Sequence, residues 1–149
     1  MINTLAQPIR VLLVDDHEIV RAGLRLLIEN HQHITVIGEA TNRAEMLQLA
    51  AAEQPDIIVL DLDLAGESSL DTMARLRGVA ARARILVLTG VGDVSAHQEA
   101  IRLGAVGLVQ KRQAPMVLIK AIEHVAIGEA WLDPSLVATV LSGLARARG

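Results

Sequence analysis

The sequence predicts an α/β domain in which a five-stranded parallel sheet is covered by helices on both faces. Five short segments are apolar throughout, which is typical of strands that are buried on both faces. Segments with helical spacing of apolar residues alternate with these strands, so each helix can bury one stripe against the sheet. The chain of 149 residues is 52% hydrophobic, which is enough for a single domain with its own core.

The expected strands are five apolar runs, each bounded by polar or turn residues: Ile9–Val14, Thr35–Gly38, Ile57–Leu60, Ile85–Leu88 and Val106–Val109. Three intervening stretches carry apolar residues on one helical face: Val20, Leu24, Leu27 and Ile28; Met46, Leu47, Ala50 and Ala51; and Leu70, Met73 and Leu76. We expect Ser69 and Asp93 to cap helix amino ends and Pro115 to lie in a first helical turn. Three glycines suit helix ends: Gly78, Gly104 and Gly128.

The C-terminal segment follows the five completed strand–helix units. Asp133 and Pro134 are expected to start a sixth helix, whose apolar residues recur on one side. This helix packs on its own domain or serves as a dimer or inter-domain helix, and the sequence leaves both alternatives open. We therefore expect a disordered segment over residues 1–8, one domain over 9–130 and a C-terminal helix or linker over 131–149.

The composition excludes several classes of function. The chain has no cysteine, which excludes disulfides, thiolate catalysis and Cys-based metal sites. A net charge of -3 and a single aromatic residue, Trp131, argue against direct binding of nucleic acid. The amino terminus lacks the pattern of a signal peptide, and no apolar run approaches the roughly 18 residues of a membrane span. We expect a cytoplasmic protein with no membrane contact.

Polar residues follow four of the predicted strands, at the edge of a parallel sheet where ligands bind. The clustered carboxylates would repel one another unless a cation lies among them, and oxygen ligands of this kind suit Mg²⁺. A hydroxyl and an ammonium group from neighbouring strands supply donors for an anion. The pattern predicts a magnesium-assisted phosphoryl site with a carboxylate acceptor, built from Asp15, Asp16, Asp61, Asp63, Thr89 and Lys111.

Each of these residues has an ordinary structural interpretation when taken alone. An Asp at a strand–helix junction caps the helix, an Asp after a strand forms a turn, Thr favours strands and Lys is solvated. Their joint occurrence at four strand ends favours the site. The histidines form no competing metal site. We expect His17 to begin the first helix near the pocket, and the other four to lie on the surface: His31, His33, His97 and His124.

Four segments carry a resemblance to a known family: "VLLVDDHEIVRAGLRLLIE", "PDIIVLDLDLAGESSLD", "ILVLTG" and "GAVGLVQK". From about Ile9 to Trp131 the chain resembles the receiver domain of bacterial two-component response regulators of the NarL/FixJ subfamily. The resemblance implies a doubly wound, flavodoxin-like sheet with strand order 2-1-3-4-5. It also implies a regulatory domain rather than an enzyme, whose only chemistry is its own phosphorylation and dephosphorylation.

The resemblance assigns a role to each residue at the strand ends: Asp61 as phosphoacceptor, Asp15 and Asp16 as Mg²⁺ ligands, Asp63 as a metal ligand through its backbone carbonyl, Thr89 as switch hydroxyl and Lys111 as the phosphate-contacting lysine. The implied phosphodonor is a histidine kinase or a small phosphorylated molecule. A homodimer is a further expected assembly. DNA would be contacted only through a helix-turn-helix domain that follows the receiver, and we favour a fragment of such a transcription regulator over a single-domain regulator.

The sequence departs from the family pattern at four positions. Ala65 and Ser69 replace the usual Pro and Gly after the phosphoacceptor, which predicts a differently shaped and more mobile loop, and Arg112 follows the lysine in place of Pro. Leu108 occupies the position of the usual switch Tyr or Phe, neither of which occurs anywhere in the chain. Our hypothesis is that movement of Thr89 is transmitted instead by repacking of the fourth helix near residues 91–97.

The carboxylate of Asp63 supports two interpretations. It faces the phosphoryl group and alters the hydrolysis rate, or it points to solvent.

Three other functions compete with the receiver. A haloacid-dehalogenase-type phosphatase shares the Asp-x-Asp pattern of Asp61 and Asp63, but that family places its nucleophile on the first strand. A nucleotide-binding site has only the isolated fragment Gly90-Val91-Gly92 in its favour. A phosphorylation-independent interaction module on the same fold is the stronger alternative, because of the loop departures and Leu108.

Overall fold

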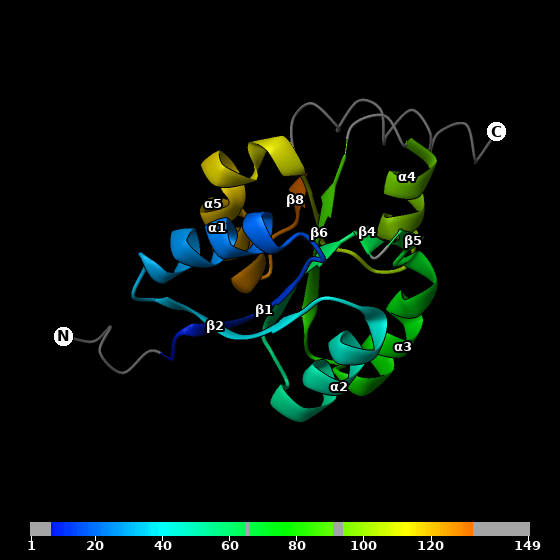
Figure 1. The fold of residues 1–149 in the computed structure, drawn as a ribbon, viewed down its shortest axis with the longest axis horizontal. Coiled ribbons are helices and arrows are strands. Elements are labelled where there is room, and N and C mark those ends of the chain that lie inside the picture. The colour runs from blue at the N-terminus through cyan, green and yellow to red at the C-terminus, as the bar shows by residue number, and fades with distance from the viewer. Residues whose placement is uncertain (1–6, 65, 91–93, 133–149) are drawn as a thin grey trace.

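The structure is a computed structural model that describes residues 7–64, 66–90 and 94–132. A six-stranded parallel sheet lies between two layers of helices (Figure 1). The strand order is β2-β1-β3-β6-β7-β8, so the predicted order is confirmed and one strand is added at the edge. The strands are β1 (Ile9–Val14), β2 (Ile34–Ala40), β3 (Ile57–Asp61), β6 (Arg84–Thr89), β7 (Gly107–Gln110) and β8 (Trp131–Leu132).

Helices cover both faces of the sheet, as predicted. Successive side chains of β1 pack into separate cores, because neighbouring residues of a strand point to opposite faces. Val11 and Leu13 face one core, which is closed by α1 (Glu18–Glu29) and α5 (Ala114–Ala126). Leu12 and Val14 face the other, which is closed by α2 (Arg43–Glu53), α3 (Met73–Val79) and α4 (Val94–Arg102). Burial on both faces explains why the inner strands β1, β3, β6 and β7 are apolar over most of their length, whereas the edge strand β2 is only partly buried.

The added edge strand, β8, consists of Trp131 and Leu132, which the sequence predicts as part of a C-terminal helix or linker. Both residues pair in parallel with β7, through Gly107 and Leu108. Gly107 permits this approach: a Cβ there would lie 2.5 Å from the Leu86 side chain and 3.1 Å from the Trp131 backbone oxygen. Two apolar residues give no strand period, so the sequence pattern has no signal for this pairing.

The described part of the loop after β3 contains short regular elements. It forms a short antiparallel pair, β4 (Asp63–Leu64) and β5 (Glu67–Ser68), followed by the 3₁₀ helix η2 (Leu70–Thr72). Ser69 precedes η2 but makes no side-chain cap, so that expectation is wrong. Its hydroxyl donates to the Asp61 carbonyl instead, at 2.8 Å.

The other helix-end predictions have mixed outcomes. Pro115 lies in the first turn of α5, as expected, after the 3₁₀ helix η3 (Lys111–Gln113). Gly104 and Gly128 have positive φ angles of 110° and 93° just after α4 and α5, which confirms their expected role. Gly78 lies inside the last turn of α3, which ends one residue later. Asp93 and the predicted sixth helix from Asp133 lie outside the described residues.

Within the described ranges, no helix combines the length and the apolar character that crossing a membrane requires.

Candidate functional site

The carboxyl edge of the sheet brings all six predicted site residues together. Asp61 is the last residue of β3 and is fully buried. The Lys111 ammonium, just after β7, lies 2.8 Å from Asp61 Oδ2. Thr89, the last residue of β6, lines a cavity of about 340 Å³ together with Asp61 and Lys111. Among the described residues the cavity is lined by Asp61, Leu62, Asp63, Ser68, Thr89, Gly90, Ala96 and Lys111.

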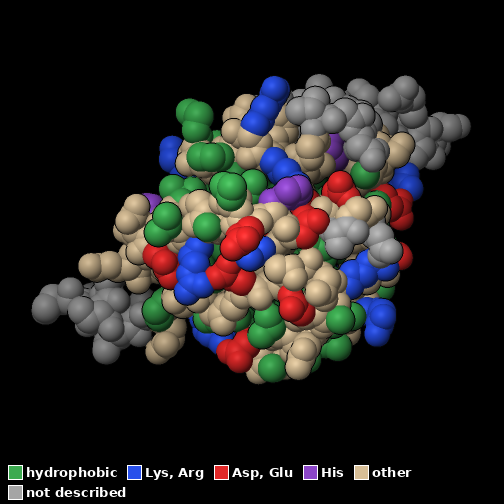
Figure 2. Space-filling view, viewed as in Figure 1, with side chains coloured by type: hydrophobic (Ala, Val, Ile, Leu, Met, Phe, Trp, Pro, Cys, Tyr) green, Lys and Arg blue, Asp and Glu red, His purple; other side chains and the backbone are tan. Residues whose placement is uncertain are grey.

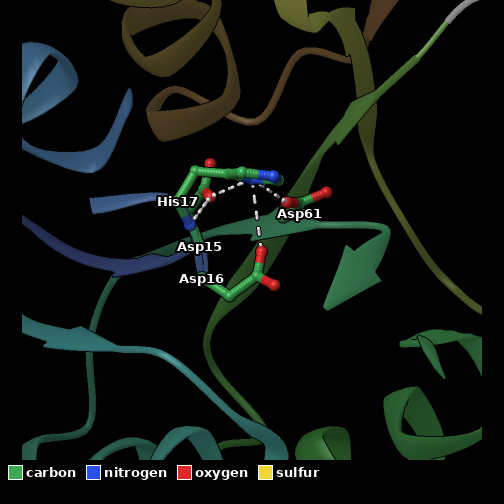
Figure 3. A group of neighbouring side chains, drawn as sticks. All are labelled: Asp15, Asp16, His17 and Asp61. Atoms are coloured by element: carbon green, nitrogen blue, oxygen red, sulfur yellow. Dashed lines mark hydrogen bonds and ion pairs between the residues drawn. The ribbon is translucent and has the colours of Figure 1, made fainter. Parts of the chain in front are cut away.

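The acidic pair after β1 lies beside Asp61 (Figure 3). Asp15, Asp16, His17 and Asp61 each offer one ligand atom, and these atoms all lie within 4.8 Å of one another. Asp15 is 1% exposed, and its Oδ1 accepts a hydrogen bond from the His17 backbone amide at 2.8 Å. Its Oδ2 is buried and has no hydrogen-bond partner among the described residues. A buried carboxylate oxygen without a donor suits a bound cation.

Opposing effects act on the pKa of Asp61. Burial raises the pKa of its carboxyl above the ordinary value, and the nearby Asp15 carboxylate acts in the same direction. The hydrogen bonds from Lys111 and from the Asp63 backbone amide oppose this rise, and the former is charge-assisted. Burial dominates, so the ionised carboxylate is a high-energy group that gains from any further positive charge.

His17 begins the first helix, as predicted, because it is the N-cap residue of α1. Its side chain makes no cap, and its ring reaches over the acidic cluster instead (Figure 3). Nδ1 lies 3.2 Å from an Asp15 oxygen, 3.3 Å from an Asp16 oxygen and 3.9 Å from an Asp61 oxygen. The sequence feature that indicates this contact is the position of His17 directly after Asp15 and Asp16.

His97 is buried, and the expectation that it lies on the surface is wrong. It is 1% exposed on α4, and its Nε2 lies 2.8 Å from the hydroxyl oxygen of Thr89. The available signal is that Ala100 and Ile101 follow at positions i+3 and i+4, which share a helix face with His97. Ala100 is fully buried in the core between α4 and the sheet. His31, His33 and His124 are at least partly exposed, as expected.

Asp63 and Ser69 contribute to the site through contacts with Asp61. The Asp63 backbone amide donates to Asp61 Oδ1 at 3.0 Å, while its own side chain is exposed at the cavity. The buried Ser69 hydroxyl donates to the carbonyl of Asp61. The sequence comparison with the family marks Ser69 only as a departure, whereas the structure shows that it fixes the backbone of Asp61.

Leu108 is fully buried in β7, within the core that α4 closes. It has no polar atom, so it cannot exchange hydrogen bonds with Thr89 as a tyrosine could.

Known proteins are similar to this chain in both sequence and fold. Residues 11–123 match the family described as the response regulator receiver domain. The nitrate/nitrite response regulator NarL of Escherichia coli is 37% identical over 93% of this chain and 64% of its own length. The transcriptional regulatory protein LiaR of Bacillus subtilis is 35% identical over 91% of this chain and 64% of its own length. The chain thus spans just under two thirds of these relatives.

Two solved structures support the same assignment. A LuxR-family two-component response regulator from Aurantimonas sp. superposes with a TM-score of 0.85 at 33% identity, covering 93% of this chain and 99% of that one. The receiver domain of the NarL regulator from Mycobacterium tuberculosis gives a TM-score of 0.77 at 27% identity, covering 83% and 100% of the two chains. With its acidic cluster and lysine at the expected sheet edge, the chain belongs to the response regulator receiver domain family, in its NarL/FixJ branch.

Proposed function

We propose that Asp61 is the phosphoacceptor of this receiver domain and that its phosphorylation switches the surface of the domain. The observation that carries the proposal is the 2.8 Å pair between the buried Asp61 carboxylate and Lys111, in the cavity that Thr89 also lines. An Asp61 oxygen attacks the phosphorus of a phosphodonor, the bond to the donor's leaving group breaks, and an acyl phosphate forms. Lys111 then pairs with a phosphoryl oxygen, and Thr89 donates its hydroxyl hydrogen to another.

The donor set fits Mg²⁺. The unpartnered Oδ2 of Asp15 lies in a cluster that also offers oxygens from Asp16 and Asp61. The backbone carbonyl of Asp63 is the fourth proposed protein ligand. When bound, Mg²⁺ neutralises the charge that gathers on the carboxylates and on the transferring phosphoryl oxygens. The Asp63 amide, which holds Asp61 Oδ1, leaves Oδ2 as the oxygen on the Lys111 side.

The proposed phosphodonor partner is a histidine kinase, and the surface beside the cavity suits such a protein. An apolar groove of about 520 Å³ between α1 and α5 is lined by residues that include Leu88 and Lys111. Ile19, Leu26 and Met116 expose 88%, 68% and 82% of their surface at or beside this groove. Hydrophobic side chains gather there, at the upper left of Figure 2. A protein helix that docks in the groove would bring its phosphohistidine close to Lys111.

The output that we propose is transcriptional. The relatives are longer than this chain, and LiaR is named a transcriptional regulatory protein. A DNA-binding domain after residue 149, reached through the helix that the sequence predicts from Asp133, would respond to the phosphorylated receiver. A second copy of this chain is a further proposed partner.

Intact mass spectrometry tests the proposed phosphorylation. The protein and Asp61→Asn are incubated with Mg²⁺ and acetyl phosphate, with and without a chelator. We expect one added phosphoryl group on the wild type alone, and none in the presence of the chelator. No adduct, together with no binding of beryllofluoride, would contradict the proposal and favour a phosphorylation-independent module. Rapid consumption of acetyl phosphate without an adduct would favour a phosphatase.

A further inference from the structure

We propose that His97 is a positioning residue that holds the Thr89 hydroxyl in its resting orientation and transmits phosphorylation to α4. This inference rests on the proposed phosphorylation of Asp61 and names the group through which that event reaches the helix. Both side chains are buried, at 2% exposure for Thr89 and 1% for His97. Their polar atoms lie 2.8 Å apart, which is a full hydrogen-bond contact between β6 and α4.

The Thr89 hydroxyl meets His97 Nε2 in the resting orientation of its side chain. Thr89 has one hydroxyl hydrogen, which it gives either to His97 Nε2 or to the Gly90 carbonyl at 3.2 Å. In the second case His97 Nε2–H donates to the hydroxyl oxygen. When the hydroxyl turns to donate to a phosphoryl oxygen on Asp61, it leaves the position in which it meets His97.

The loss of Thr89 leaves His97 in an unfavourable state. The other ring nitrogen, Nδ1, is already buried without a hydrogen-bond partner among the described residues. After Thr89 turns away, neither nitrogen has a partner, and a buried polar group in that state carries a full desolvation penalty. Movement of the ring toward water or toward a new donor relieves this penalty. Because the ring is buried at 1% exposure, its displacement changes the packing of α4 against the sheet.

Other features of the chain also favour His97 as the residue that links Thr89 to α4. The chain contains no Tyr or Phe, and Leu108 has no polar atom with which to follow the hydroxyl. His97 is the only buried histidine of the five, all of which lie in the described ranges. Ala96, its neighbour on α4, lines the cavity that contains Asp61, so this helix forms part of the cavity wall.

Nitrogen-15 NMR of the histidine rings tests the proposal on the unmodified chain. We expect the His97 ring resonances to shift when Mg²⁺ and beryllofluoride are added, and to stay unchanged in Asp61→Asn under the same conditions. Beryllofluoride that perturbs the amides of Asp61 and Lys111 but not the His97 ring would overturn the role of His97 and leave the proposed function intact. Absence of any beryllofluoride binding would overturn both.

A substitution series separates positioning from simple packing. His97→Leu fills the space without a hydrogen-bonding group, so Thr89 is released, and we expect the Kd for beryllofluoride to fall by about three- to tenfold. His97→Gln retains a donor and should lie closer to the wild type. The matched control is His31→Leu, on the turn before β2 at the opposite sheet edge, with no expected change. An equal or weaker affinity in a folded His97→Leu protein contradicts the proposal.

Discussion

Asp61 is the residue at which burial and charge compete most directly. It is fully buried next to the Asp15 carboxylate, and Lys111 and the Asp63 backbone amide compensate its charge. Because burial destabilises the ionised carboxylate, a bound cation stabilises it strongly. After phosphorylation, Lys111 and a metal ion can neutralise the charge of the phosphoryl group.

The first prediction concerns the free energy of unfolding of Asp61→Asn in the presence of a chelator. The folded-state pKa of Asp61 is raised, so the folded protein holds this proton more tightly than the unfolded chain does. Ionisation of Asp61 therefore lowers the free energy of unfolding as pH rises from the ordinary Asp pKa of 3.8 to the raised pKa of the folded state, and the loss is complete above the folded-state pKa. We expect Asp61→Asn to exceed the wild type in urea unfolding at pH 7, with the difference closing as pH falls toward the ordinary Asp pKa of 3.8.

The exposed Asp63→Asn serves as the control for this experiment, because its side chain is in solvent. A wild type that equals or exceeds Asp61→Asn at pH 7 would show that Lys111 outweighs burial.

The second prediction concerns the carboxylate of Asp63, for which the sequence leaves two interpretations open. The side chain is exposed at the cavity, where water screens its charge. We expect the half-life of phosphorylated Asp63→Asn to differ from that of the wild type by less than about threefold, in keeping with weak surface electrostatics. A larger change would mean that this carboxylate turns toward the phosphoryl group.

The third prediction concerns the buried hydrogen bond from Ser69 to the Asp61 carbonyl. Ser69→Ala removes the donor from a buried acceptor, and we expect it to lower the free energy of unfolding by about 1–3 kcal/mol. Ser68→Ala is the matched control, because the Ser68 hydroxyl is exposed and accepts only a 3.2 Å bond from the Leu70 amide. Equal losses in both variants under urea denaturation would argue against a special role for Ser69.

At the scale of elements, the edge strand β8 depends on the absence of a side chain at Gly107. The peptide after Trp131 approaches so closely that a Cβ at Gly107 would require Leu86 and the strand backbone to shift. Trp131 also donates its backbone amide to the Val106 carbonyl at 3.0 Å, which fixes the start of the pairing. The last two described residues, Trp131 and Leu132, therefore belong to the sheet.

The fourth prediction compares two Gly→Ala substitutions. Gly107→Ala meets a backbone oxygen and is expected to destabilise the domain by about 1–3 kcal/mol and to shift the emission of Trp131, the only tryptophan. Gly78→Ala, on α3 with nothing within 4 Å, is expected to stabilise by about 0.5–1 kcal/mol through helix propensity. Unchanged emission and stability in Gly107→Ala would show that β8 tolerates displacement.

The strands and helices could be predicted from the sequence wherever the burial of an element's faces shows in its pattern of apolar residues. The four inner strands β1, β3, β6 and β7 are mostly apolar because both of their faces are buried, and this shows in the sequence, whereas the edge strand β2 is only partly buried. β8 was missed because two residues carry no period, and its partner is distant in sequence. His97 was missed because a histidine on a short helix is equally compatible with either face until the packing of its neighbours Ala100 and Ile101 is known.

At the scale of the whole molecule, the carboxyl edge of the sheet brings together residues that are far apart in the sequence. Four residues lie at or just after the carboxyl ends of four strands, namely Asp15, Asp61, Thr89 and Lys111, and the apolar groove between α1 and α5 adjoins the same edge. Binding at the edge should therefore stabilise the entire fold.

The fifth prediction measures this linkage by thermal unfolding. Beryllofluoride and Mg²⁺ at about 100 times the Kd should stabilise the wild type by about 2.7 kcal/mol, which raises the Tm by roughly 10 °C in a domain of this size. Asp61→Asn should show no such increase, and a chelator should abolish it. An equal rise in Asp61→Asn would place the binding site elsewhere.

The sequence pattern alone determined the class of the fold, the five main strands and the residues at the strand ends, whereas the spatial order of the strands was predicted through the family resemblance. The fold class, the strands and the strand-end residues follow from local rules, because burial sets strand composition and chain direction brings the carboxyl ends to one edge. Only the tertiary structure decided which polar atoms meet: the ring of His17 over the carboxylates, the Ser69 hydroxyl on the Asp61 carbonyl, and His97 on Thr89. A hydrogen bond depends on distances of about 3 Å between elements, which residue spacing does not contain.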